Sequence, residues 1–173
     1  MRLSEVVERY TIKEFEAWEG KWEIIKGIPL AMAPFAFVRH QKIATFIAGE
    51  LNKNRECNEC FAVVESEWYI DKETVVRPDC LFVCTDEKER LTKTPEIIFE
   101  IVSPSSAKRD EIVKFDLYEN EGVKYYCLVY PDYKKVKIYK NENGFKKVAE
   151  CYKEEYEFDI ICKVSVNFEK VFE

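Results

Sequence analysis

The sequence predicts an α/β protein in which one mixed β-sheet is flanked by α-helices. Short apolar runs of strand length are interspersed with segments of helical periodicity. Two of these runs, 79–84 and 97–102, are almost continuously apolar, which is typical of strands covered on both faces. The chain contains no repeat, low-complexity stretch or interdomain linker. We therefore expect residues 1–173 to form a single domain.

Three segments have the character of helices. Thr11 and Glu14 form a capping box that opens a short helix, which we expect to stop near Gly20. A second helix is predicted over 38–54, with one stripe made of His40, Ile43, Ala44, Ile47 and Leu51. A third is predicted over 108–121, where Gly122 occupies the C-cap position.

Strands account for the remaining apolar runs. A hairpin is predicted around Lys26 and Gly27. Further strands follow the same criteria of length and flanking turn residues. The predicted strands cover 22–25, 28–32, 61–70, 79–84, 97–102, 125–130, 136–139 and 145–151.

Composition excludes several classes of protein. Hydrophobic residues are 47% and charged residues 35% of the chain, the balance of a globular rather than a disordered protein. No apolar run approaches the roughly 20 residues of a membrane-spanning helix. The sequence turns acidic from Ser4 onward and lacks the apolar stretch of a secretory signal. We expect a cytoplasmic protein without membrane contact.

The net charge of −6 is unfavourable for a protein that binds nucleic acid, although a local basic patch can bind while the rest stays acidic. Candidates for such a patch are Lys108 and Arg109, Arg39 and Lys42, and the run Lys134, Lys135, Lys137 and Lys140. The run is equally well explained as the solvated face of an edge strand, and we favour that interpretation.

The seven cysteines are odd in number and irregularly spaced, apart from Cys57 and Cys60, which predicts reduced thiols rather than a disulfide framework. Cys80, Cys84 and Cys127 lie in apolar runs, where a cysteine behaves as a small hydrophobe. The Cys57-x-x-Cys60 pair has half the ligands of a zinc site. No second pair or suitably placed histidine completes it in the sequence.

Two carboxylates stand in strands predicted to be buried. Glu100 interrupts the apolar run 97–102, and Asp79 heads the run 79–84. A buried carboxylate must be paired, protonated or bound to metal, and two that converge provide the oxygen ligands that Mg²⁺ prefers. The ordinary alternatives are a strand-end Asp that caps a turn and a Glu that pairs with a core lysine.

Lys114 lies within the apolar arc of the third predicted helix, which points it towards the sheet together with Asp110. Such a lysine is either a partner for a buried carboxylate or a snorkelling stem. The alternative is an Asp110–Lys114 pair on the surface, which stabilises little.

Five strings in this order resemble the Uma2 family of restriction endonucleases, a branch of the PD-(D/E)XK nuclease superfamily. The resemblance extends from about Tyr10 to Tyr139. The strings are Trp22-Glu23-Ile24-Ile25-Lys26-Gly27, Arg77-Pro78-Asp79, Phe99-Glu100-Ile101-Val102-Ser103-Pro104-Ser105-Ser106, Asp110-x-x-x-Lys114-x-x-x-Tyr118 and Gly122-Val123-x-Tyr125-Tyr126.

The resemblance implies a restriction-endonuclease-like fold with Asp79 and Glu100 as catalytic, metal-holding residues. Val102 stands where the superfamily motif has its lysine, and Lys114 matches the helix lysine that replaces it in this family. Glu23 matches a recurrent acidic position and is a candidate third metal ligand. His40, the only histidine, matches a recurrent histidine position and is a candidate catalytic residue that would contact a phosphate or tune the metal site, with a satisfied core histidine as the favoured alternative.

The sequence thus predicts an endonuclease that hydrolyses DNA phosphodiester bonds with Mg²⁺ (or Mn²⁺) and acts as a homodimer. Two alternatives remain open. One is a catalytically impaired, nuclease-like module that binds DNA or protein, which Val102 and the negative net charge favour. The other is an interaction protein in which part of the 14% aromatic content forms a subunit contact.

Overall fold

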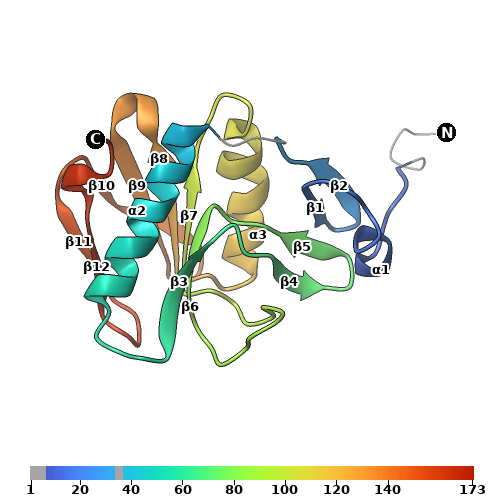
Figure 1. Ribbon diagram of the computed structural model, residues 1–173, viewed down its shortest axis with the longest axis horizontal. Coiled ribbons are helices and arrows are strands. Elements are labelled where there is room, and N and C mark those ends of the chain that lie inside the picture. Colours follow the sequence, from blue (N-terminus) through green and yellow to red (C-terminus); the bar gives the residue numbers. More distant parts are fainter. Residues whose placement is uncertain (1–6, 34–36) are drawn as a thin grey trace.

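A six-stranded mixed sheet forms the centre of the protein, as the computed structural model of residues 7–33 and 37–173 shows (Figure 1). This confirms the predicted α/β class. Strands β7 and β8 are parallel, whereas the other neighbours in this sheet are antiparallel. The strand order is β10 (Phe145–Cys151), β9 (Lys135–Asn141), β8 (Tyr125–Tyr130), β7 (Ile97–Ile101), β6 (Cys80–Cys84) and β3 (Cys60–Val64).

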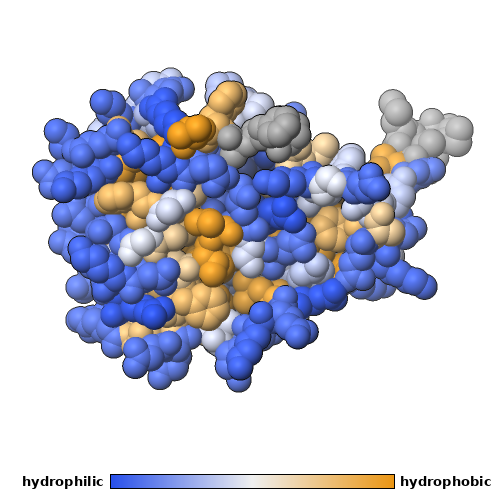
Figure 2. Space-filling model, viewed as in Figure 1, coloured by the Kyte–Doolittle hydropathy of each residue, from blue (hydrophilic) through white to orange (hydrophobic). Residues whose placement is uncertain are grey.

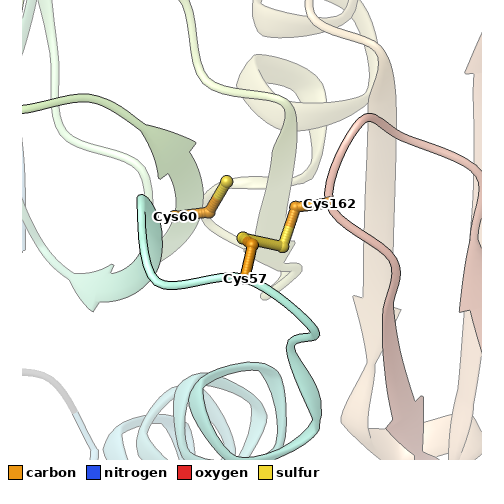
Figure 3. A group of neighbouring side chains, drawn as sticks. All are labelled: Cys57, Cys60 and Cys162. Carbon is orange, nitrogen blue, oxygen red and sulfur yellow. A yellow bond between two sulfur atoms is a disulfide. The ribbon is translucent and has the colours of Figure 1, made fainter.

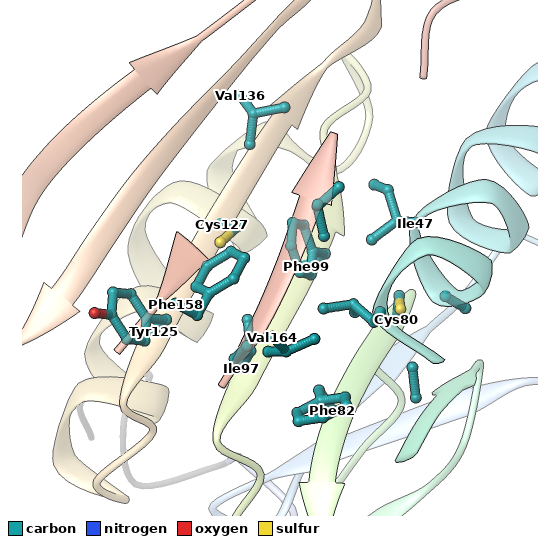
Figure 4. Close-up of a cluster of buried hydrophobic side chains, with 14 of the residues drawn as sticks. Ile47, Cys80, Phe82, Ile97, Phe99, Tyr125, Cys127, Val136, Phe158 and Val164 are labelled. Carbon is teal, nitrogen blue, oxygen red and sulfur yellow. The ribbon is translucent and has the colours of Figure 1, made fainter. Parts of the chain in front are cut away.

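One face of the central sheet is covered by α2 (Val38–Asn54) and by the hairpin of β11 (Glu155–Phe158) and β12 (Val164–Asn167). Side chains from these elements close over Phe82 and Phe99 in one buried cluster (Figure 4). The bounds of α2 match the helix predicted over 38–54, which is confirmed. The apolar residues of its predicted stripe are buried in this cluster.

The opposite face is covered by α3 (Lys114–Asn120), which continues from a π-helical turn, η2 (Arg109–Val113). Alternation along β7 sends Ile98 to this face, where it shares a second cluster with Tyr118 and Tyr126. A π-turn inserts an extra residue into a helix and is frequent at functional sites. Here it contains Asp110 and ends directly before Lys114.

A smaller sheet with the order β2-β1-β5-β4 lies beside the main one, on the side of α3 (Figure 1). Lys26 and Gly27 have positive φ angles of 50° and 79°, as a tight hairpin turn requires, so the predicted hairpin is confirmed. The elements of this layer are α1 (Ile12–Phe15), β1 (Trp22–Ile25), β2 (Ile28–Ala31), β4 (Trp68–Asp71) and β5 (Thr74–Val76).

Several predicted boundaries are wrong. The strand expected over 61–70 divides at Glu65, whose φ of 49° turns the chain so that β3 and β4 enter different sheets. The first helix ends at Phe15 rather than near Gly20. The lysine run was assigned to an edge strand, but β9 lies between β8 and β10. The hairpin β11–β12 was not predicted.

The prediction of seven reduced thiols is also wrong in this structure. Disulfides join Cys57 to Cys162 and Cys60 to Cys84. The sequence spacing hid these pairs because Cys57 and Cys162 are 105 residues apart and meet only through the fold. Three cysteines, namely Cys80, Cys127 and Cys151, are free and buried.

Within the described residues, no helix is long and apolar enough to cross a membrane. Hydrophilic side chains cover most of the face shown in Figure 2.

Candidate active site

Asp79 and Glu100 lie side by side. The antiparallel register pairs Cys80 on β6 with Phe99 on β7, so the two carboxylates occupy the next positions along the strands. The backbone N–H of Asp79 lies 3.3 Å from Glu100 Oε2, to which it donates. In turn, the N–H of Ile101 donates to Asp79 Oδ2 over 2.7 Å. The main chain therefore fixes both side chains at the same end of the sheet.

Lys114 contacts Glu100 from the first turn of α3. Its Nζ lies 2.8 Å from Glu100 Oε1, which also accepts a 2.9 Å hydrogen bond from the Tyr118 hydroxyl. Lys114 and Asp110 are both buried, at 1% and 2% exposure, so the alternative of a surface pair between them is wrong. The apolar Val102 follows β7, and its side chain packs against the cluster on this face.

Glu23 approaches Lys114 from the smaller sheet. Its Oε1 lies 2.7 Å from Lys114 Nζ and accepts a hydrogen bond of 2.8 Å from the N–H of Arg77. Its Oε2 is buried and has no hydrogen-bond partner among residues 7–33 and 37–173. The Arg109 Nε, at 3.8 Å, is a neighbouring cationic atom. Lys114 Nζ thus contacts a carboxylate of each sheet, Glu23 and Glu100.

His40 projects from α2 onto Asp79. Its Nε2 lies 3.2 Å from Asp79 Oδ2, and 23% of its side chain is exposed. Nδ1 is buried without a hydrogen-bond partner in the described part of the chain. The alternative of a satisfied core histidine therefore does not fit this structure.

These side chains line one cavity of about 380 Å³. Four of the five predicted site residues are present in its wall, and Glu23 is not. Lys21 and Glu65, which form a 3.1 Å ion pair, also line it, and no sequence signal had indicated them. The lining includes Asp79, Glu100, Lys114, His40, Asp110, Arg109, Ser103, Ser105 and Ser106.

Burial and charge separate the pKa values of Glu100, Asp110 and Asp79, three of the carboxylates that line the cavity. Burial raises the pKa of Glu100 well above its usual range, and the negative charge of Asp79 adds to this effect. Burial also raises the pKa of Asp110, to about 6. For Asp79 the hydrogen bond and charge of His40 and the N–H of Ile101 outweigh burial and lower the pKa.

The site has an excess of buried negative charge. Glu23, Glu100 and Asp110 are buried and Asp79 is partly buried, whereas the cationic side chains at close range are Lys114, the partly exposed Arg109 and, when protonated, His40. Uncompensated buried carboxylates are costly, so a cation in the cavity would stabilise them. An all-oxygen donor set with an ionised Asp79 is chemically suited to Mg²⁺ or Mn²⁺.

Comparisons with known proteins bear on the family and the fold. Residues 12–160 match the sequence pattern of the Uma2 family, described as "Putative restriction endonuclease". Among solved structures, the chain is similar to the crystal structure of "a putative nuclease belonging to DUF820" from Anabaena variabilis ATCC 29413. The TM-score is 0.74 at 15% identity, covering 94% of this chain and 97% of the other. Among curated proteins, none matches significantly.

Proposed function

The chain belongs to the Uma2 family of restriction endonucleases, and from that premise we propose that it hydrolyses DNA phosphodiester bonds in a metal-dependent reaction. The observation that carries the proposal is the pair of adjacent carboxylates, Asp79 and Glu100, beside the buried Lys114 in one cavity. Members of the nuclease class combine these three groups because phosphoryl transfer needs a metal site and an additional positive charge.

Asp79 and Glu100 are the proposed ligands of Mg²⁺ (or Mn²⁺). When bound, such an ion polarises a phosphoryl oxygen and lowers the pKa of a coordinated water. Asp79 presents an ionised carboxylate because His40 and the Ile101 N–H lower its pKa. The N–H of Asp79 and the hydroxyl of Tyr118 orient the Glu100 carboxylate from two sides.

Lys114 is proposed to stabilise the charge that develops on the phosphate or to orient the attacking water. Burial opposes its charge, but Glu100, Glu23 and Asp110 raise its pKa above the usual value, so the ammonium group stays protonated. A permanent cation donates hydrogen bonds and does not serve as a general base. The contacts of Glu23 support a positioning role for it through Lys114; the metal-ligand role predicted for Glu23 stays a prediction.

DNA phosphates are proposed to approach through the open side of the cavity. Arg109 lines it, and the adjacent Lys108 is exposed. Arg39 is less available because it is paired with Asp132 over 2.8 Å. The hydroxyls of Ser103 and Ser105 also line the cavity and can donate to phosphate oxygens. The cytoplasmic location expected from the sequence stays a prediction.

Plasmid nicking tests the proposal. Asp79→Asn and Glu100→Gln should each abolish Mg²⁺- or Mn²⁺-dependent nicking, a loss of at least about 100-fold. The matched control is Glu96→Gln, because Glu96 is a half-buried carboxylate four positions before Glu100 and accepts its hydrogen bond from Cys84. Control activity should equal wild type. Undiminished cleavage by both site variants would refute the assignment.

A second candidate is a nuclease-like module that binds DNA without cutting it. The observation in its favour is that Val102 occupies the motif-lysine position while Lys114 is already held by two carboxylates. Wild-type protein that binds Mn²⁺ and DNA but nicks no plasmid would support this candidate and contradict the enzyme proposal.

A further inference from the structure

Four cysteines from separate parts of the sequence meet at the end of the central sheet opposite to the candidate active site. Cys57 follows α2, Cys60 begins β3, Cys84 ends β6, and Cys162 lies between β11 and β12. Asp79 directly precedes the first residue of β6, whereas Cys84 is its last. The cysteine group is therefore independent of the carboxylate site.

The sulfur atoms form one group rather than two separate pairs. The Sγ atoms of Cys57, Cys60 and Cys162 all lie within 4.8 Å of one another, although Cys60 is bonded to a different partner, Cys84. Figure 3 shows the Cys60 side chain beside the bond that joins Cys57 and Cys162. With Cys84, which is bonded to Cys60, these cysteines supply four sulfurs, the number of ligands in a structural zinc site with Zn–S bonds of about 2.3 Å.

Backbone geometry suits a disulfide between Cys57 and Cys162, whose Cα atoms are 5.7 Å apart, better than one between Cys60 and Cys84. Cys60 and Cys84 are directly opposite each other on antiparallel strands, and their Cα atoms are 3.8 Å apart. This separation is below the range of about 4.4–6.8 Å that disulfides usually span. The Cys57-x-x-Cys60 spacing is also the spacing with which zinc sites take two ligands from one turn. The fold supplies the other two ligands, which the sequence spacing did not reveal.

Burial suits a structural centre. Cys60, Cys84 and Cys162 are 2%, 8% and 3% exposed, and Cys57 is half-buried. The charges around the cysteines do not by themselves indicate a metal site, because Lys88 and Lys93 line the adjoining groove together with acidic side chains. The grouping of three Sγ atoms within 4.8 Å of one another, with Cys84 bonded to one of them, is what marks this location as a candidate metal site.

We propose that these four cysteines, when reduced, bind one zinc ion in a tetrahedral site that fastens the C-terminal hairpin to the central sheet. A dithiol or phosphine reductant supplies two electrons for each disulfide, and two protons complete the thiols. Zinc then replaces the thiol protons, which are released to solvent. The hairpin β11–β12 forms a two-stranded sheet of its own, so a metal linking Cys162 to Cys57, Cys60 and Cys84 holds it in place.

Metal analysis of the full chain tests this proposal. The protein is purified without a histidine tag and reduced with a phosphine until a thiol reagent counts seven thiols in a denatured aliquot, and the remaining unmodified protein is then supplied with zinc. After desalting, elemental analysis should find one zinc per chain. Replacing zinc with cobalt should give the intense visible bands and the sulfur-to-metal charge-transfer band of tetrahedral thiolate coordination.

Variants assign the metal to these residues. Cys162→Ser should lose the charge-transfer band, whereas Cys151→Ser, a buried cysteine outside the group, should retain it. Asp79→Asn combined with Glu100→Gln should also retain it, which separates this result from the nuclease proposal. A fully reduced wild-type chain that retains no zinc and gives no thiolate–cobalt bands would overturn the proposal. Bands that survive in Cys162→Ser would overturn the assignment.

Discussion

The ammonium group of Lys114 lies between Glu100 Oε1 at 2.8 Å and Glu23 Oε1 at 2.7 Å, with almost no exposure to solvent. A buried cation is tolerated only when its partners are close and well oriented. Each carboxylate is held in turn by another donor, the hydroxyl of Tyr118 for Glu100 and the N–H of Arg77 for Glu23. Lys114 is therefore the residue that joins the smaller sheet to the candidate active site.

Removing this cation should be costly. Lys114→Met leaves Glu23 and Glu100 buried without their shared partner, and we expect the free energy of unfolding to fall by about 3–5 kcal/mol. Urea denaturation measures the change. The control, Lys108→Met, alters an exposed lysine and should change stability by less than about 0.5 kcal/mol. A Lys114→Met variant as stable as wild type would contradict the paired arrangement.

His40 should titrate above its usual pKa in metal-free protein. Burial lowers this pKa, but the hydrogen bond and charge of Asp79 outweigh burial and raise it. The raised value means that the stabilisation from the protonated imidazole is complete below about pH 6.5 and is lost as pH rises through the folded-state pKa. Because His40 is the only histidine, its NMR signals can be followed without ambiguity. In Asp79→Asn the pKa should fall, and an unchanged value would contradict the contact.

For single residues, the sequence was informative where a charged side chain stands in a segment predicted to be buried. Glu100 was predicted as a site residue because it is a carboxylate in an apolar strand. Lys114 was predicted because it is a lysine in the apolar face of a helix. The meeting of the four cysteines could not be predicted in this way, because Cys84 and Cys162 lie in separate parts of the chain that approach Cys60 and Cys57 only after folding. The pairing of Glu23 with Lys114 was hidden for the same reason.

At the scale of elements, periodicity predicted the bounds of α2, β8 and β10 as they occur. In α2 and β8 the apolar pattern is long and unbroken. The prediction was poorer where one residue redirects the chain, as at Glu65, whose positive φ separates β3 from β4. It also missed β11 and β12, short strands in a charged segment that gains its order by packing on α2 and the central sheet.

The turn between β1 and β2 offers a test at this scale. Gly27 has a φ of 79°, and an added Cβ would lie 2.8 Å from the Cβ of Arg9. We expect Gly27→Ala to destabilise the protein by about 1–3 kcal/mol. In contrast, Gly49→Ala lies within α2 with no atom near its Cβ and should stabilise by about 0.5–1 kcal/mol. Thermal unfolding of both variants measures the two changes in stability. Equal changes would contradict a strained turn at Gly27.

At the scale of the whole molecule, the central sheet carries two separate chemical groups. The carboxylates lie at the end of the sheet where β6 begins, and the cysteines lie where β6 ends. The smaller sheet contributes Glu23 to the first group, and the C-terminal hairpin contributes Cys162 to the second. The smaller sheet is therefore held by the ion pair of Glu23 with Lys114, and the C-terminal hairpin by the sulfur of Cys162, in addition to apolar packing.

Oligomeric state is a prediction at this scale. An enzyme that cuts both strands of duplex DNA commonly places two active sites by two-fold symmetry, so we expect a homodimer. Light scattering during gel filtration should give the mass of two chains at micromolar concentration. A strictly monomeric mass, both alone and with duplex DNA, would instead indicate nicking of one strand at a time.

The location of a bound divalent ion tests the central claim most directly. Crystals soaked in Mn²⁺ should show anomalous density in the cavity, in contact with carboxylate oxygens of Asp79 and Glu100. The same soak of Glu100→Gln crystals should show that density weakened or lost. A wild-type crystal with no manganese at these two residues, or with manganese bound only elsewhere, would contradict the proposed metal-dependent active site.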